Sequence, residues 1–130
     1  MNLLLGAFLA AHALIHGSYL TPAPPRTADG PEWPFATAHS WLVTAIGLDP
    51  ALVRALGIAL VLATIALLAA ASLATVGWIV PAGWWPALVV GGAAASALTL
   101  ILFFHPWLVL GLAIDAALLW AVLVMGWSPA

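Results

Sequence analysis

Charged residues are almost absent from this 130-residue chain, which carries Arg26, Asp29, Glu32, Asp49, Arg54 and Asp115. A soluble domain carries roughly a quarter of its residues as charges. Because 66% of the residues are hydrophobic, the folded chain has too little charged surface for water, and we expect lipid to be its main solvent. The lack of a basic run also argues against nucleic acid as a partner.

Cysteine is absent as well, which excludes disulfides, thiolate metal sites and thiol catalysis. The sequence has no phosphate-binding glycine loop and no H-E-x-x-H motif. No nucleophile-elbow context surrounds Ser18, Ser40, Ser72 or Ser96. We therefore predict no catalytic residue, and a non-enzymatic protein is favoured.

Long hydrophobic runs dominate what is present. A helix needs about 20 apolar residues to cross the hydrocarbon, and four runs are long enough: 2–20, 51–76, 86–104 and 106–127. Asp49-Pro50 reads as the N-cap and first residue of the second helix. His105-Pro106 divides an apolar stretch of about forty residues, which is too long for one span. The predicted fold is an all-α membrane protein, with residues 1–130 forming one domain of four transmembrane helices.

The proline-rich segment after residue 20 is expected to be a loop, and residues 36–47 are expected to form a short interfacial helix ended by Gly47. The first run contains Ala11-His12-Ala13, which loosely fits a signal-peptide cleavage site. However, no basic residue precedes the run and it continues to Leu20, so we interpret it as a retained span.

Four spans place both termini on one membrane side, here called face A, with face B opposite. Tryptophan prefers the headgroup level, and most tryptophans fall at predicted ends. These are Trp78, Trp84, Trp85 and Trp127 at face A, and Trp33, Trp41 and Trp107 at face B. Both arginines lie on face B, which the positive-inside rule would put in the cytoplasm. A proline-rich loop on the outside is nearly as plausible, so the orientation stays open.

The histidines all fall in the face B half of this topology. His12 and His16 lie one helical turn apart on the same side of the first span. Asp115 lies ~14 Å down the fourth span, near mid-membrane, where a carboxylate costs about 2.5–3.5 kcal/mol on insertion scales. It must therefore face the bundle, and His12 is its nearest candidate partner in depth. The expected polar cluster is His12, His16, His39, His105 and Asp115.

Three interpretations of this cluster are open. The first is structural: His12 pairs with Asp115, while the other histidines bond loop carbonyls or headgroups, His105 as a helix cap. The second is a metal or haem site. Zinc or copper would suit nitrogen ligands, whereas haem would need histidines on opposite helices; the candidate ligands are His12, His16, His39 and His105. The third is proton or small-solute handling through the His and Asp residues.

Other polar residues are assigned to packing or to lipid. Gly92, Ser96 and Thr99 form a small-residue face on the third span, typical of close helix packing in membranes, with a polar pathway through the bundle as the alternative. Arg54, in the first turn of the second span, is expected to reach lipid headgroups by snorkelling.

Three stretches carry a resemblance: His12-Ala-Leu-Ile-His16-Gly17, Trp84-Trp85 and Gly111-Leu-Ala-Ile-Asp115. They resemble a scattered group of small, uncharacterised bacterial four-helix membrane proteins, which are similar to DoxX-like proteins in size only. The resemblance implies the fold and no activity, and we expect the chain to lie in a bacterial cytoplasmic membrane. Because almost nothing on the chain is built to act in water, we expect a structural or accessory protein that contacts the lipid bilayer and other membrane subunits.

Overall fold

The computed structural model describes residues 2–25, 30 and 32–129, and over these residues the chain is all-helical. Helix α1 (Asn2–His16) continues into the 3₁₀ turn η1 (Gly17–Leu20), and α3 spans Pro50–Thr75. The turns η3 (Ala82–Trp84) and η4 (Pro106–Leu108) lead into α4 (Trp85–Leu102) and α5 (Val109–Leu123). All four segments are long and apolar enough to cross a membrane, which confirms the predicted fold class.

Helix ends follow from local capping chemistry. The Asp49 carboxylate accepts a hydrogen bond of 2.9 Å from the Leu52 amide, and Pro50 supplies the first helical residue of α3. His105 Nδ1 accepts a 3.2 Å bond from the Trp107 amide and caps η4. At the other end, α5 stops at Leu123, earlier than predicted, and the chain turns at Gly126 with a positive φ of 61°.

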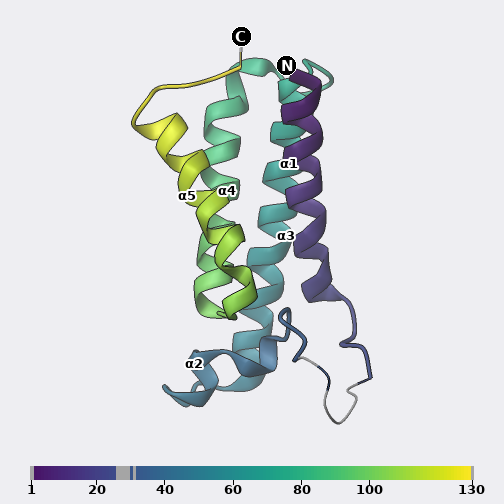
Figure 1. The fold of residues 1–130 in the computed structure, drawn as a ribbon, viewed down its shortest axis with the longest axis vertical. Helices are drawn as coiled ribbons and strands as arrows, with labels where there is room; N and C mark the ends of the chain where they lie inside the picture. The colour runs from purple at the N-terminus through teal and green to yellow at the C-terminus, as the bar shows by residue number, and fades with distance from the viewer. Residues whose placement is uncertain (1, 26–29, 31, 130) are drawn as a thin grey trace.

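The short helix α2 (Trp41–Thr44) lies at the end of the bundle opposite the two termini (Figure 1). It follows the 3₁₀ turn η2 (Thr37–His39) and is shorter than the predicted 36–47. Ser40 Oγ donates to the Leu102 carbonyl oxygen at 2.7 Å, and Trp41 Nε1 donates to that of Ile101 at 2.9 Å. The last carbonyls of α4 thus gain partners that a helix end otherwise lacks. In Figure 1 the termini mark face A and α2 marks face B.

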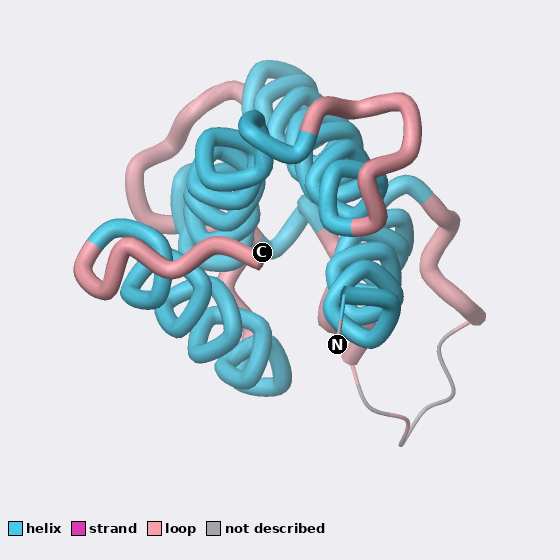
Figure 2. The backbone as a smooth tube through the Cα atoms, turned by 90° about the horizontal axis from the view of Figure 1, so that it is seen from above, coloured by secondary structure: helices cyan, strands magenta, loops and turns pink. Residues whose placement is uncertain are grey.

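The four long helices form an open arc (Figure 2), in which α1 packs on α3, α3 on α4 and α4 on α5. A small residue allows close approach at each contact. A Cβ on Gly92 would lie 2.6 Å from Leu68, and a Cβ on Gly111 would lie 2.8 Å from Leu100. Between α1 and α3, Ser72 Oγ donates to the Gly6 carbonyl oxygen at 2.7 Å. Helices α1 and α5 border the open side of the arc.

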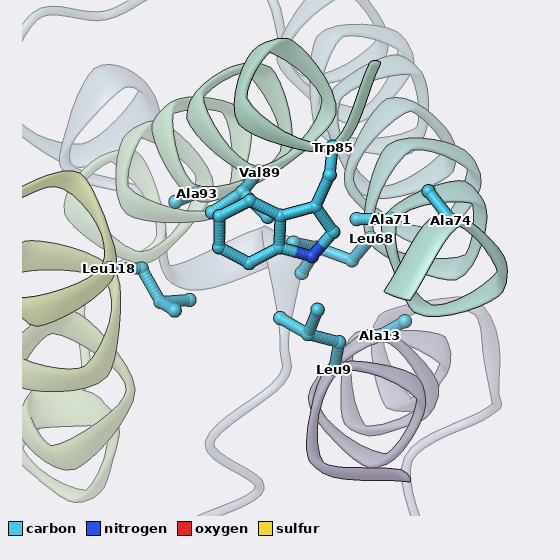
Figure 3. Close-up of a cluster of buried hydrophobic side chains, with 9 residues drawn as sticks. All are labelled: Leu9, Ala13, Leu68, Ala71, Ala74, Trp85, Val89, Ala93 and Leu118. Atoms are coloured by element: carbon cyan, nitrogen blue, oxygen red, sulfur yellow. The ribbon is translucent and has the colours of Figure 1, made fainter. Parts of the chain in front are cut away.

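Apolar side chains from all four helices meet in the face A half of the bundle (Figure 3). This face A core consists of Leu9, Ala13, Leu68, Ala71, Ala74, Trp85, Val89, Ala93 and Leu118. The Trp85 ring was expected at the headgroups, but it points inward with 1% of its surface exposed. Its indole N–H donates to Thr75 Oγ1 at 2.8 Å, which satisfies the one polar atom of the ring.

Candidate functional site: a buried Asp–Ser–His network

Three helices bring polar side chains together in the bundle interior. His12 and His16 lie one turn apart on α1, Ser96 comes from α4 and Asp115 from α5, and none is more than 5% exposed. His12 Nε2 lies 2.9 Å from Asp115 Oδ1. This contact joins residues that are 103 positions apart in the sequence.

Ser96 is the junction of the network. Its hydroxyl lies 2.5 Å from Asp115 Oδ2 and 2.9 Å from His16 Nε2, so it links the carboxyl group to the second imidazole. Its distance to His12 Nε2 is longer, at 3.5 Å. The sequence pattern favoured helix packing for Ser96 and did not predict these contacts, although a hydroxyl on a small-residue face is a signal for a contact with a polar group on a neighbouring helix.

The hydrogen bonds of the network determine how many protons its side chains must carry. The other ring nitrogen of His16, Nδ1, bonds the His12 carbonyl oxygen at 3.1 Å. A carbonyl only accepts, so Nδ1 must carry a proton. Four bonds then need four hydrogens: His12–Asp115, Ser96–Asp115, Ser96–His16 and His16–carbonyl. Two neutral histidines and one serine supply only three.

The network therefore forms all four bonds only when it holds one proton more than an ionised Asp115 with two neutral histidines. Two arrangements satisfy this count. In one, Asp115 is ionised, Ser96 donates to it, and a doubly protonated His16 donates to Ser96. In the other, Asp115 is protonated and donates to Ser96, which donates to a neutral His16. The two forms interconvert when one proton moves between His16 and Ser96 and another moves between Ser96 and Asp115.

Apolar layers lie on both sides of the network along the bundle. Towards face A lies the face A core, which includes Leu9 of α1 and Leu118 of α5, about one helical turn from His12 and Asp115. Towards face B lies a second cluster, the face B core, made of Tyr19, Leu42, Val53, Val61, Leu100, Phe103 and Leu108. The Tyr19 hydroxyl in this cluster is enclosed and has no hydrogen-bond partner among the described residues.

A cavity of about 180 Å³ reaches the histidines from the open side of the arc. Its polar lining is His12 and His16. The other lining residues are apolar side chains and Gly111, and they come from α1, from the segment after η1, and from α4, η4 and α5. Three lining residues at its edge are strongly exposed: Ile15, Trp107 and Leu110. In a membrane these apolar side chains would face lipid, so the cavity opens sideways into the bilayer.

The remaining predicted cluster residues lie elsewhere or outside the described part. His105 is half-buried in the hairpin before α5, where it caps η4 and meets the Trp107 ring edge-on at 6.0 Å. The backbone of His39 closes η2, while its side chain lies outside the described residues. The structure thus brings together three of the five predicted residues, His12, His16 and Asp115, and adds Ser96.

Among the described residues, no group of three His, Cys, Asp or Glu side chains is placed to hold a metal ion. The structure therefore adds no support to the metal interpretation. The ring nitrogens of His16 are both engaged, and Ser96 occupies the point on which His16 and Asp115 converge. Haem would need a histidine on a helix facing α1, and the sequences of α3, α4 and α5 contain none.

Arg54 lies on the exposed surface of the first turn of α3, with no hydrogen bond or ion pair to the described residues. It borders a second cavity of about 470 Å³ at face B, together with Thr21 and Thr37. The interpretation of Arg54 as a contact for lipid headgroups stays a prediction. The other arginine, Arg26, lies outside the described residues.

Comparison of the chain with protein-family models, curated proteins and solved structures returned no match. We therefore infer function from the geometry of the buried network.

Proposed function

We propose that this chain is a multi-pass protein of the bacterial cytoplasmic membrane that holds and exchanges a proton inside the bilayer. The observation that carries the proposal is the proton count of the Asp115–Ser96–His16 chain. A site whose bonds require one additional proton, and which can place that proton at either end, is suited to proton handling.

Electrostatics supports the proposal. With the additional proton, the four side chains together are neutral, either as an ionised Asp115 beside a protonated His16 or as two uncharged groups. Without it, a net negative charge would lie at mid-membrane, which costs about 2.5–3.5 kcal/mol on insertion scales. The titratable groups that face Asp115 are His12 and His16, both from α1, whereas α3 and α4 contribute no ionisable side chain at this depth.

Access to the site favours exchange with a molecule dissolved in the membrane. The two apolar cores separate the network from both faces along the bundle axis. The side cavity, in contrast, reaches His12 and His16 from lipid. Such a site would take up or release a proton locally and would not conduct protons across the bilayer.

Infrared spectroscopy after a pH jump on the protein in liposomes tests the proposal. When both forms of the network are populated, loss of the additional proton should change a carboxyl band and a histidine ring band together, and Asp115→Asn should abolish this coupled change. Asp49→Asn is the matched control, because Asp49 is an exposed cap and asparagine also caps helices well; the coupled bands should survive it. If no pH in the folded range alters the Asp115 and His16 bands, the cluster is only structural and the proposal is wrong.

A second candidate function is that of an accessory subunit, and the exposure of α5 favours it. Only 11% of the residues of Pro106–Leu123 are buried, compared with 39% in an 18-residue window of Ala82–Leu102. A photo-crosslinker at Leu123, which is 65% exposed, should capture another membrane subunit if α5 is an interface. Migration as a strict monomer in mild detergent and in native membranes would count against this role.

A further inference from the structure

We propose that the side cavity between α1 and α5 binds a lipid-soluble ring compound that carries a hydroxyl group, with this hydroxyl donating a hydrogen bond to His12 Nδ1. The inference rests on the proposed proton-handling function and names the class of molecule with which the network would exchange its proton.

His12 has one ring nitrogen that a ligand could bond. Its Nε2 is used in the contact with Asp115, and Nδ1 has no hydrogen bond to the described residues. The only fully enclosed side-chain polar atoms without a partner in the described chain are the Tyr19 hydroxyl and Trp33 Nε1. His12 Nδ1 therefore keeps some accessible surface, and His12 lines the cavity.

The proton count of the network makes that nitrogen a hydrogen-bond acceptor. When the network holds its one additional proton, all four protons lie within the four bonds, and none remains for Nδ1. A neutral imidazole whose proton is on Nε2 presents a lone pair at Nδ1. The matching group on a ligand is then a donor such as O–H, and a carbonyl or ether oxygen would not fit.

The volume and the apolar walls of the cavity suit a single ring. A cavity of roughly 150 Å³ lined by apolar side chains accepts benzene, and this one measures about 180 Å³. Its walls include Leu100, Leu108 and Ile114, and its edge carries Ile15 and Leu110. A single aromatic ring fits this volume and polarity, and such a molecule would arrive through lipid.

Two neighbouring side chains, Asp115 and Phe8, contact the His12 ring. Asp115 Oδ1 holds Nε2 at 2.9 Å and thereby fixes the orientation of the ring. The Phe8 ring stacks near it, with the planes 9° apart and the centroids 6.3 Å apart. A ligand hydroxyl at Nδ1 would thus connect through one imidazole to the Asp115–Ser96–His16 chain.

The probes are phenol and toluene, which have similar shapes and differ in a hydroxyl and a methyl group. The protein carries ¹⁵N-labelled histidine and is placed in lipid nanodiscs. We expect phenol to shift the His12 Nδ1 resonance saturably and toluene to bind about tenfold more weakly, since one hydrogen bond to a buried partner is worth about that factor. Equal binding of the two probes, or no saturable shift with phenol, would overturn the inference.

A matched pair of variants locates the site. Leu110→Trp places a larger ring at the cavity edge and should weaken phenol binding at least about tenfold. Leu123→Trp changes an equally lipid-facing leucine of α5 that does not line the cavity, and it should leave binding unchanged. If Leu110→Trp binds phenol as the wild type does, the ligand does not occupy this cavity and the inference fails.

The two proposals can fail separately. Infrared spectroscopy of the same samples without phenol reports whether Asp115 and His16 share a proton. If they do and phenol does not bind, only the ligand inference is wrong. If phenol binds at His12 while Asp115 and His16 show no coupled change, the proton-handling proposal is wrong, and the cavity is a binding site without a relay.

Discussion

The face A core and the polar network are neighbouring parts of one bundle, and the side chains of both are almost fully buried. In the face A core, Leu9, Val89 and Leu68 are 0% exposed and contact their neighbours by van der Waals packing. In the network, Ser96 and Asp115 are also 0% exposed but are held by hydrogen bonds. Equal burial thus results from two different physical causes within about one helical turn of α1.

The two regions differ in the interactions that stabilise them. Apolar packing in lipid gains little from the hydrophobic effect and depends on close contact. A change in side-chain volume in the face A core should therefore lower the stability of the bundle. The network depends on partner atoms and on a proton, so it tolerates no unmatched donor or acceptor. The following variants are chosen to separate these demands.

The largest loss of stability is expected for Trp85→Ala in the face A core. Truncation of a buried tryptophan costs about 3–5 kcal/mol in soluble proteins, and we expect about 3 kcal/mol here because lipid supplies little of the transfer contribution. Reversible unfolding in mixed micelles measures the change. Trp84→Ala is the control, because Trp84 is 64% exposed; equal effects would show that the face A core does not hold the bundle.

Gly92→Ala should come next, at about 2 kcal/mol, because a Cβ there would lie 2.6 Å and 2.8 Å from Leu68 and force α3 and α4 apart. Gly83→Ala is the control, since a Cβ at Gly83 has nothing within 4 Å. The same unfolding assay compares them. A Gly92→Ala protein as stable as Gly83→Ala would contradict the close helix approach.

Ser96→Ala and Ser72→Ala should cost similar stability, about 1 kcal/mol each, because each removes one hydroxyl that joins two helices, buried at Ser96 and part-buried at Ser72. Only Ser96→Ala should uncouple the carboxyl and histidine bands in the infrared spectrum. If Ser72→Ala uncouples them as well, the effect comes from loosened packing, and Ser96 is no relay.

The smallest effect is expected on the passive proton permeability of liposomes. Apolar side chains lie on both sides of the network along the bundle, so adding the protein should leave the decay of an imposed pH gradient unchanged. A fluorescent pH indicator inside the vesicles measures this. A faster decay that Asp115→Asn removes would show a path through one of the cores.

Much of the fold could be predicted from the sequence, because hydropathy and breakers act locally. Asp49-Pro50 and His105-Pro106 mark helix starts by capping and by the fixed proline backbone, and both lie where expected. The end of α5 was predicted too late, since residues after Leu123 stay apolar and hydropathy carries no signal for the turn at Gly126. Trp85 was misplaced because a preference for headgroups does not reveal which rings turn inward.

The candidate site could be anticipated only in part. Depth along the helices suggested His12 as a partner for Asp115, and the two side chains lie 2.9 Å apart. Depth alone does not give rotation about a helix axis, and it therefore could not reveal that Ser96 of α4 faces both Asp115 and His16. His105 was grouped with the cluster by depth, yet its ring faces its own hairpin, where local capping determines its position.

The most direct test of the account is the proton content of the network in lipid bilayers at neutral pH. Solid-state NMR with ¹⁵N-labelled histidine and ¹³C-labelled aspartate reports the protonation of His12, His16 and Asp115 in one sample. We predict either a protonated Asp115 with two neutral histidines or an ionised Asp115 with a doubly protonated His16. An ionised Asp115 beside two neutral histidines would contradict the account.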